Sequence, residues 1–203
     1  MTNLDRVKNK IKRAPKGSLF ILGDFSHLNI PYNTLKEYIR RLVKSGELRL
    51  VYRGIYQKPK FNNKLNREVP ASPSDIANTY ARKNNWKIVP SGDTALNQLG
   101  LTTQVPNTYQ YKSSGPNREI ILKSGIKISF ENTVSREIDM EKTSALVIEA
   151  LKSIGEENAN DDVLKIITDK LSDTQLKQLR KDVALSRNWI RDLVVIMEEN
   201  IKC

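Results

Sequence analysis

Polar and basic side chains suited to nucleic-acid recognition recur at helical spacing after residue 31. In the segment PYNTLKEYIRRLVKSG, apolar residues follow the i, i+4, i+7, i+8 pattern of a buried helical face: Leu35, Ile39, Leu42 and Val43. The exposed residues in the first turns of this helix would be Tyr32, Asn33, Lys36, Glu37 and Arg40. In the major groove, Asn pairs with adenine, Lys pairs with guanine, and Glu accepts from cytosine. We therefore expect these five side chains to contact base edges.

A second set of cations on and after the same helix suits DNA phosphates: Arg41, Lys44, Arg49, Arg53 and Lys58. Phosphate contacts set the position and orientation of a protein on a duplex without reading its sequence. If six or more such contacts form, affinity falls steeply as the salt concentration rises. The alternative is a protein-binding module whose charges are only solvated.

The positive charge of the chain is concentrated near its start. The net charge is +11 over 203 residues, and residues 1–60 hold fourteen Lys and Arg against four Asp and Glu, a net of +10. The rest of the chain is close to neutral. This asymmetry indicates a polyanion-binding segment joined to a neutral domain.

Residues 1–60 show a pattern of three helices followed by a β-hairpin. Apolar spacing predicts helices over 4–14 and from 35 to 45, with a short helix in GDFSHLN between them. The β-prone runs LRLVY and IYQ are separated by Arg53-Gly54, which suits a tight turn. The pattern predicts a winged helix-turn-helix, a fold whose second motif helix enters the major groove of duplex DNA.

The rest of the chain is predicted to be a linker, 61–73, and a second domain, 74–203. In that domain, helical patterns in SPSDIANTYARKNN and GDTALNQLGL flank the strand WKIVP. The segments TYQYKS, REIILK and IKISFEN are predicted strands, and four helical patterns occupy about 140–203. The predicted fold class is α+β: an N-terminal winged helix-turn-helix, then a mixed α/β domain with a helical C-terminal tail.

Catalytic and metal chemistry have little support in the sequence. His27 is the only histidine and Cys203 the only cysteine, so neither has a second residue of its kind for a metal site or a disulfide. The acidic residues Glu137, Asp139 and Glu141 suit either a Mg²⁺ site or an acidic turn at a domain boundary. A metal-dependent DNA-processing enzyme is therefore the weaker alternative, and we expect no enzyme activity and no cofactor.

No part of the sequence is suited to a membrane. No run approaches the ~20 apolar residues of a membrane span. The basic N-terminal segment lacks the apolar stretch of a secretion signal. We expect a cytoplasmic protein with no membrane partner.

Two segments resemble the AbiEi-type antitoxins of bacterial abortive-infection (type IV) toxin-antitoxin systems. The first is TLKEYIRRLVKSGELRLVYRGIYQKP, Thr34 to Pro59, which contains the Arg-Gly-Ile-Tyr signature at its hairpin. The second is PSGDTALNQLGLTTQVPNTYQY, Pro90 to Tyr111, in which a small-residue helix ends at Gly-Leu before a Gln-x-Pro loop and a strand. The resemblance spans roughly residues 8 to 139, and the helical tail lies outside it.

This resemblance implies a protein with two functions in phage defence. The N-terminal domain would repress its own operon by binding inverted repeats in promoter DNA, with self-association on that DNA. The C-terminal domain would oppose a nucleotidyltransferase-like toxin, without a stable complex in the type IV description. The matched positions imply base contacts by Asn33, Lys36 and Arg40 and a phosphate contact by Arg53. The alternative is a winged-helix transcriptional regulator whose C-terminal part is a dimerisation or effector domain, with no toxin partner.

Overall fold

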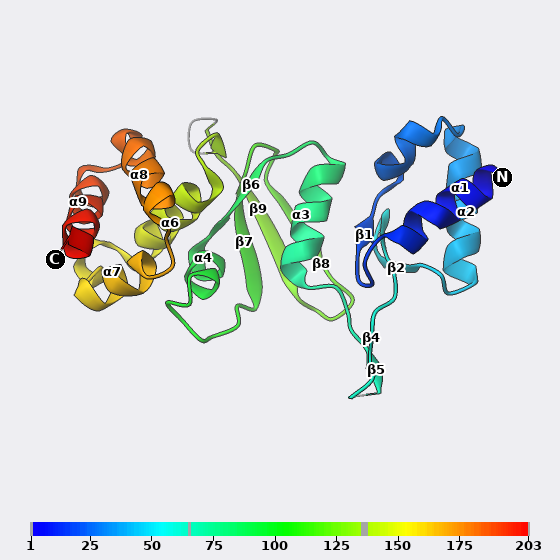
Figure 1. Cartoon of the computed structure of the whole chain (residues 1–203), viewed down its shortest axis with the longest axis horizontal. Helices are drawn as coiled ribbons and strands as arrows, with labels where there is room; N and C mark the ends of the chain where they lie inside the picture. Colours follow the sequence, from blue (N-terminus) through cyan, green and yellow to red (C-terminus); the bar gives the residue numbers. More distant parts are fainter. Residues whose placement is uncertain (1, 65, 135–137, 203) are drawn as a thin grey trace. The chain divides into compact units, whose positions relative to one another are not determined.

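The computed structural model describes residues 2–64, 66–134 and 138–202, and its fold class is α+β, as the sequence predicted. The chain divides into two compact units, Met1–Asn85 and Trp86–Cys203. Each unit contains its own cluster of buried apolar side chains, so each has a separate core. Figure 1 shows the elements along the chain.

The first part of this unit combines three helical segments with a small antiparallel sheet (Figure 1). The helical segments are α1 (Asn3–Arg13), η1 (Leu22–Leu28) and α2 (Tyr32–Lys44). The strands β1 (Leu19–Phe20), β2 (Arg49–Tyr52) and β3 (Ile55–Gln57) pair antiparallel in the order β1-β3-β2. Helices and hairpin therefore form where the apolar spacing and the Arg53-Gly54 turn predicted them.

The core of the first unit contains buried residues of α1, η1 and α2, together with Phe20 of β1 and Leu48. Val7 and Ile11 of α1 and Phe25 of η1 are buried in the same cluster as α2. Leu35, Ile39 and Leu42 of α2 are buried as their spacing predicted, and Val43 is half-buried. Because this face of α2 is used for packing, its polar face is left to solvent.

The expected linker at 61–73 contains structure, and the division between the units lies after it. Strands β4 (Phe61–Asn62) and β5 (Arg67–Glu68) form a two-stranded antiparallel ribbon. The helix that follows, α3 (Pro73–Lys83), belongs to the first unit rather than to the second.

Side-chain contacts attach α3 to the first unit. Arg82 forms an ion pair with Asp24, and Lys83 Nζ donates to the carbonyl oxygen of Arg53 at 2.7 Å. The Tyr80 ring lies edge-on to the Tyr52 ring, with centroids 5.8 Å apart. These contacts move the boundary from the predicted 61–73 to residues 85 and 86.

The second unit is built on a four-stranded sheet with strand order β6-β7-β9-β8 (Figure 1). The strands are β6 (Ile88–Ser91), β7 (Thr108–Ser113), β8 (Arg118–Ile121) and β9 (Lys127–Asn132). Strands β7 and β9 are parallel, and the other pairs are antiparallel. Tyr111 and Phe130 stack on one face, with ring centroids 5.9 Å apart. The opposite face has polar residues along β7 and β9.

The helices of the second unit form its larger core. After β6 comes α4 (Gly92–Gln98), and the C-terminal part contains α6 (Lys142–Ile154), η2 (Glu156–Asn158), α7 (Asp161–Thr168), α8 (Asp173–Asp182), η3 (Val183–Leu185) and α9 (Asn188–Lys202). The four predicted helical patterns after residue 140 are thus confirmed. Ile190, Val194 and Met197 bury one face of α9 in this core. Within the described ranges, no helix combines the length and apolar character needed to cross a membrane.

Candidate nucleic-acid interface

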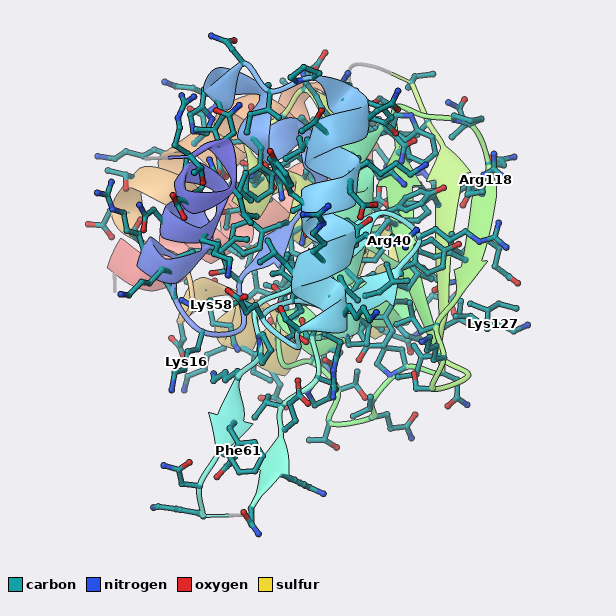
Figure 2. The ribbon with its side chains drawn as sticks, turned by 90° about the vertical axis from the view of Figure 1, so that its right-hand side faces the viewer. Lys16, Arg40, Lys58, Phe61, Arg118 and Lys127 are labelled. Carbon is teal, nitrogen blue, oxygen red and sulfur yellow. The ribbon has the colours of Figure 1, made fainter. Side chains whose placement is uncertain are left out.

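The exposed face of α2 holds most of the side chains predicted to contact bases. Tyr32 is 64% exposed at the first residue of the helix. Asn33, Lys36 and Arg40 are also exposed, whereas Leu35, Ile39 and Leu42 of the same helix are buried. Figure 2 shows Arg40 on α2. One helix therefore presents aromatic, amide and cationic groups on a single solvent-facing surface.

Two of the predicted base-contacting residues, Glu37 and Arg40, are already paired with each other. The Glu37 carboxylate pairs with Arg41 Nε at 3.3 Å and with Arg40 Nε at 3.7 Å. All three side chains are substantially exposed, and such pairs contribute about 0–1 kcal/mol each. A phosphate or a base can therefore displace Glu37 at small cost.

The start of α2 lies close to strand β3. Burial raises the pKa of the Tyr56 hydroxyl, and the nearby Tyr32 hydroxyl raises this pKa further. Pro31, at the N-cap position, provides no side-chain hydrogen bond to the helix. The first N–H groups of α2 therefore lack a side-chain acceptor, and helix starts of this kind attract anions.

Lys83 lies at the turn between β2 and β3, a position that was not predicted from the sequence. Gly54 has a φ of +75°, as the tight turn requires. Lys83 Nζ donates to the carbonyl oxygen of Arg53, so its ammonium group lies beside the Arg53 backbone. No local sequence signal links Lys83 to this turn, because thirty residues separate the two and only the packing of α3 joins them.

The five predicted phosphate contacts differ in how free they are. Arg49 forms an ion pair with Glu68 of β5. Lys58 Nζ donates to the carbonyl oxygens of Lys12 at 2.8 Å and Ala14 at 2.7 Å, so it satisfies the C-terminal end of α1.

Arg41, another of the five, pairs with Glu37 on α2. Lys44 and Arg53 have no acidic partner among the residues that the structure describes. Lys44 and Arg53 are therefore the cations of this set most available to DNA.

A second basic area surrounds α1 rather than α2. A groove of about 460 Å³ is lined by lysines of α1, of the loop after it and of the segment after β3: Lys8, Lys12, Lys16 and Lys58. Figure 2 labels Lys16 and Lys58. Glu47 lies in the same groove and pairs with Lys8 at 2.9 Å. Part of the positive charge of the first unit therefore lies in this groove and not on α2.

One protein-family model matches most of the chain. A family model described as a family of unknown function, DUF6088, matches residues 6–179. The chain belongs to the DUF6088 family. The matched range includes the basic surfaces of the first unit and the sheet of the second, and it ends within α8. No curated protein matches the chain.

Two of the three acidic residues considered for metal binding, Asp139 and Glu141, have structural roles in this DUF6088 protein. Asp139 pairs with Lys87, and the Glu141 carboxylate accepts from the N–H groups of Thr143 at 2.7 Å and Ser144 at 3.0 Å, at the start of α6. Glu137 lies outside the described residues.

Cys203 likewise lies outside the described residues, and His27 is exposed on η1. In the part of the chain that is described, no three His, Cys, Asp or Glu side chains gather closely enough to hold a metal ion.

Proposed function

We propose that the first unit of this DUF6088 protein is a winged helix that binds duplex DNA. In this proposal α2 enters the major groove and the turn between β2 and β3 contacts the adjacent phosphates. One observation carries the proposal: the exposed face of α2 presents Asn33, Lys36 and Arg40 opposite a buried apolar face. The net charge of +10 in residues 1–60 supports it.

The contacts that each side chain makes within the protein indicate which residues would contact bases and which would contact phosphates. Tyr32, Asn33, Lys36, Glu37 and Arg40 would contact base edges, while Arg41, Lys44 and Arg53 would contact phosphates. Lys83 joins the phosphate set because it lies beside the turn. Arg49 and Lys58 would contact DNA less directly, because Arg49 pairs with Glu68 of β5 and Lys58 Nζ donates to two carbonyl oxygens at the end of α1.

A paired substitution on α2 tests the DNA-binding proposal. Lys36→Ala with Arg40→Ala should weaken binding to the chain's own promoter by about 1–3 kcal/mol for each base pairing that the substitution removes. Gel-shift titration at physiological salt measures this change. Lys165→Ala is the matched control, because Lys165 is exposed on α7 in the second unit and has no such proposed role. Unchanged affinity of the paired variant would contradict the proposal that α2 enters the major groove.

The resemblance to AbiEi-type antitoxins extends the proposal to the biological role. The protein would act in the cytoplasm as the repressor of its own operon, bound to inverted repeats and self-associating on them. Its second unit would oppose a nucleotidyltransferase-like toxin encoded beside it. Neither role includes a catalytic step or a cofactor.

A growth assay separates the two roles. Cells expressing the neighbouring toxin gene should be protected equally by the wild-type chain and by the Lys36→Ala, Arg40→Ala variant, because protection is assigned to the second unit. Loss of protection in that variant would contradict the division of labour. A neighbouring gene whose product is harmless would favour the alternative, a transcriptional regulator without a toxin partner.

A further inference from the structure

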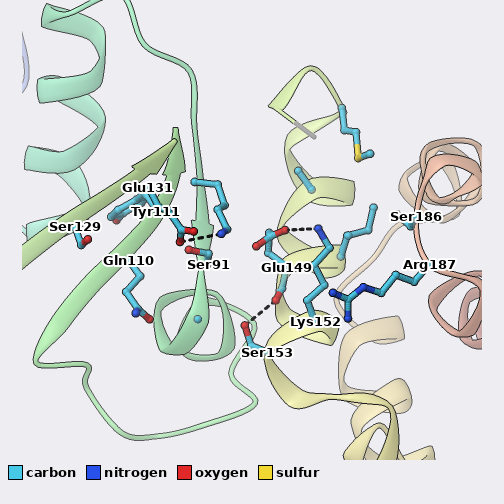
Figure 3. A pocket seen from close by; sticks show the side chains of 15 residues that line it. Ser91, Gln110, Tyr111, Ser129, Glu131, Glu149, Lys152, Ser153, Ser186 and Arg187 are labelled. Atoms are coloured by element: carbon cyan, nitrogen blue, oxygen red, sulfur yellow. Dashed lines mark hydrogen bonds and ion pairs between the residues drawn. The ribbon is translucent and has the colours of Figure 1, made fainter. Parts of the chain in front are cut away.

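The polar face of the sheet in the second unit borders a cavity of about 700 Å³ (Figure 3). The strand register aligns Ser91, Gln110 and Ser129 in one row across β6, β7 and β9. Lys112 and Glu131 lie in a neighbouring row of the same face. Helix α6 forms the opposite wall, and the segment before α9 completes it. Cavities of roughly 300–1,000 Å³ are typical of small-molecule sites.

The composition of this cavity is unusual for the contact between a sheet and a helix. Such contacts are normally filled by apolar side chains, because burial of apolar area stabilises the layers. Here charged groups and hydroxyls line much of the space, together with Tyr111, Met140, Ala145 and Ile148. A polar lining that leaves the space open does not serve core packing.

Among the described residues that line the cavity, cations outnumber carboxylates. On the sheet wall, Lys112 Nζ pairs with Glu131 at 2.8 Å. On the helix wall, Lys152 Nζ pairs with Glu149 at 2.8 Å. Arg187 is a third cation, and no acidic residue of the described ranges pairs with it. The described lining thus contains three cations and two carboxylates.

The helix wall holds a buried carboxylate directed at this space. The Glu149 side chain is only 8% exposed, and burying a carboxylate costs free energy unless a partner compensates it. Figure 3 shows the Glu149 carboxylate pointing toward the sheet, while the Arg187 side chain extends from its loop toward α6. Cationic donors and carboxylate acceptors therefore face the same cavity.

We propose that this cavity binds a small phosphorylated sugar, free or as part of a nucleotide. Arg187 and Lys152 would hold the phosphate, since guanidinium and phosphate form paired hydrogen bonds and a phosphate monoester has about −1.5 to −2 charge at neutral pH. Its three terminal oxygens need several donors, and Ser186 lies beside Arg187. Glu149, Gln110 and Ser91 would bind the hydroxyl groups of the sugar. The proposal is independent of DNA binding by the first unit.

Isothermal titration calorimetry on the full chain tests the site with four probes: AMP, ribose 5-phosphate, adenosine and ribose. The two phosphorylated probes should bind, and the two phosphate-free probes should bind at least about tenfold more weakly, as expected when charged hydrogen bonds are absent. Tighter binding of AMP than of ribose 5-phosphate would identify a nucleotide. Equal binding would identify the sugar phosphate. Both results support the proposal.

Matched arginine substitutions locate the binding. Arg187→Ala should weaken the phosphorylated probes by about tenfold or more. Arg191→Ala should leave their affinity unchanged, because Arg191 is exposed on α9, hydrogen-bonds to Asn188 and lies outside the cavity lining. Circular dichroism confirms that both variants are folded. The proposal is overturned if neither phosphorylated probe binds, if adenosine binds as tightly as AMP, or if Arg187→Ala has no effect.

Discussion

At the scale of single residues, the turn between β2 and β3 has cations suited to contact DNA phosphates rather than to read bases. The Arg53 side chain has no acidic partner among the described residues, and Lys83 lies against its carbonyl oxygen. Two adjacent cations at the tip of a hairpin suit the phosphate backbone rather than a base edge. The hairpin would then add affinity for any duplex.

Arg53→Ala should therefore weaken binding to all DNA sequences alike. The slope of log affinity against log salt concentration should fall in magnitude by about one, the value for a single neutralised phosphate. Gel shifts with promoter and unrelated duplexes over a salt series measure both quantities, with Lys165→Ala as the control. A change in base preference would show that this turn contacts bases instead.

A second prediction at this scale concerns Tyr56, whose hydroxyl pKa is raised by burial and by Tyr32. Because the folded state favours the neutral hydroxyl, this contribution to stability is complete below the ordinary tyrosine pKa of about 10. It disappears as the pH rises through the raised pKa. Urea unfolding at pH 8 and at higher pH should show a smaller alkaline decrease in stability for Tyr56→Phe than for the wild type. Equal decreases would contradict this prediction.

At the scale of elements, Gly54 allows the positive φ of the hairpin turn and also leaves room for the Lys83 side chain beside the turn. Gly54 has a φ of +75°, and a Cβ at this position would lie 2.8 Å from Lys83 Nζ. An alanine would be strained and would also displace the flexible Lys83 ammonium from the Arg53 carbonyl oxygen. The hairpin and α3 are thus coupled at this turn.

Gly54→Ala should destabilise the first unit by about 1 kcal/mol or more, because the strain of alanine at positive φ exceeds the usual entropic gain from replacing glycine. Chemical unfolding of the full chain measures the change. Gly23→Ala is the matched control: Gly23 is not at positive φ, and its Cβ would meet Ile21 at an ordinary 3.6 Å. If the two variants are equally stable, the turn tolerates a side chain and the assigned strain is absent.

At the scale of the whole molecule, the boundary after Asn85 changes what an independent DNA-binding fragment must contain. A fragment ending at residue 60 lacks Arg82, Lys83 and Tyr80, and with them the contacts to Asp24, Arg53 and Tyr52. It also lacks the β4–β5 ribbon and its pairing of Glu68 with Arg49. The complete first unit is residues 1–85.

Residues 1–85 should therefore melt at a higher temperature than residues 1–60. For domains of this size, each kcal/mol of destabilisation lowers the melting temperature by about 4–8 °C. Thermal unfolding followed by circular dichroism compares the fragments, and gel shifts should show promoter binding by 1–85. Identical melting temperatures would mean that α3 adds nothing to the first unit.

The sequence alone determined the features that depend on neighbours a few residues away. The spacing of Leu35, Ile39 and Leu42 predicted α2 and its buried face, and Arg53-Gly54 predicted the hairpin turn. The helical patterns after residue 140 and the strands of the second unit were also predicted correctly. Helical and strand periodicities are short-range, so a linear pattern is enough to reveal them.

Only the tertiary structure decided which distant residues meet. Contacts between residues far apart in the chain assign α3 to the first unit. They also bring Lys58 to the C-terminal end of α1 and Lys83 to the hairpin turn. The cavity likewise joins the row of Ser91, Gln110 and Ser129 to α6 and Arg187. Such contacts follow from how cores pack in three dimensions, and local periodicity has no information about that packing.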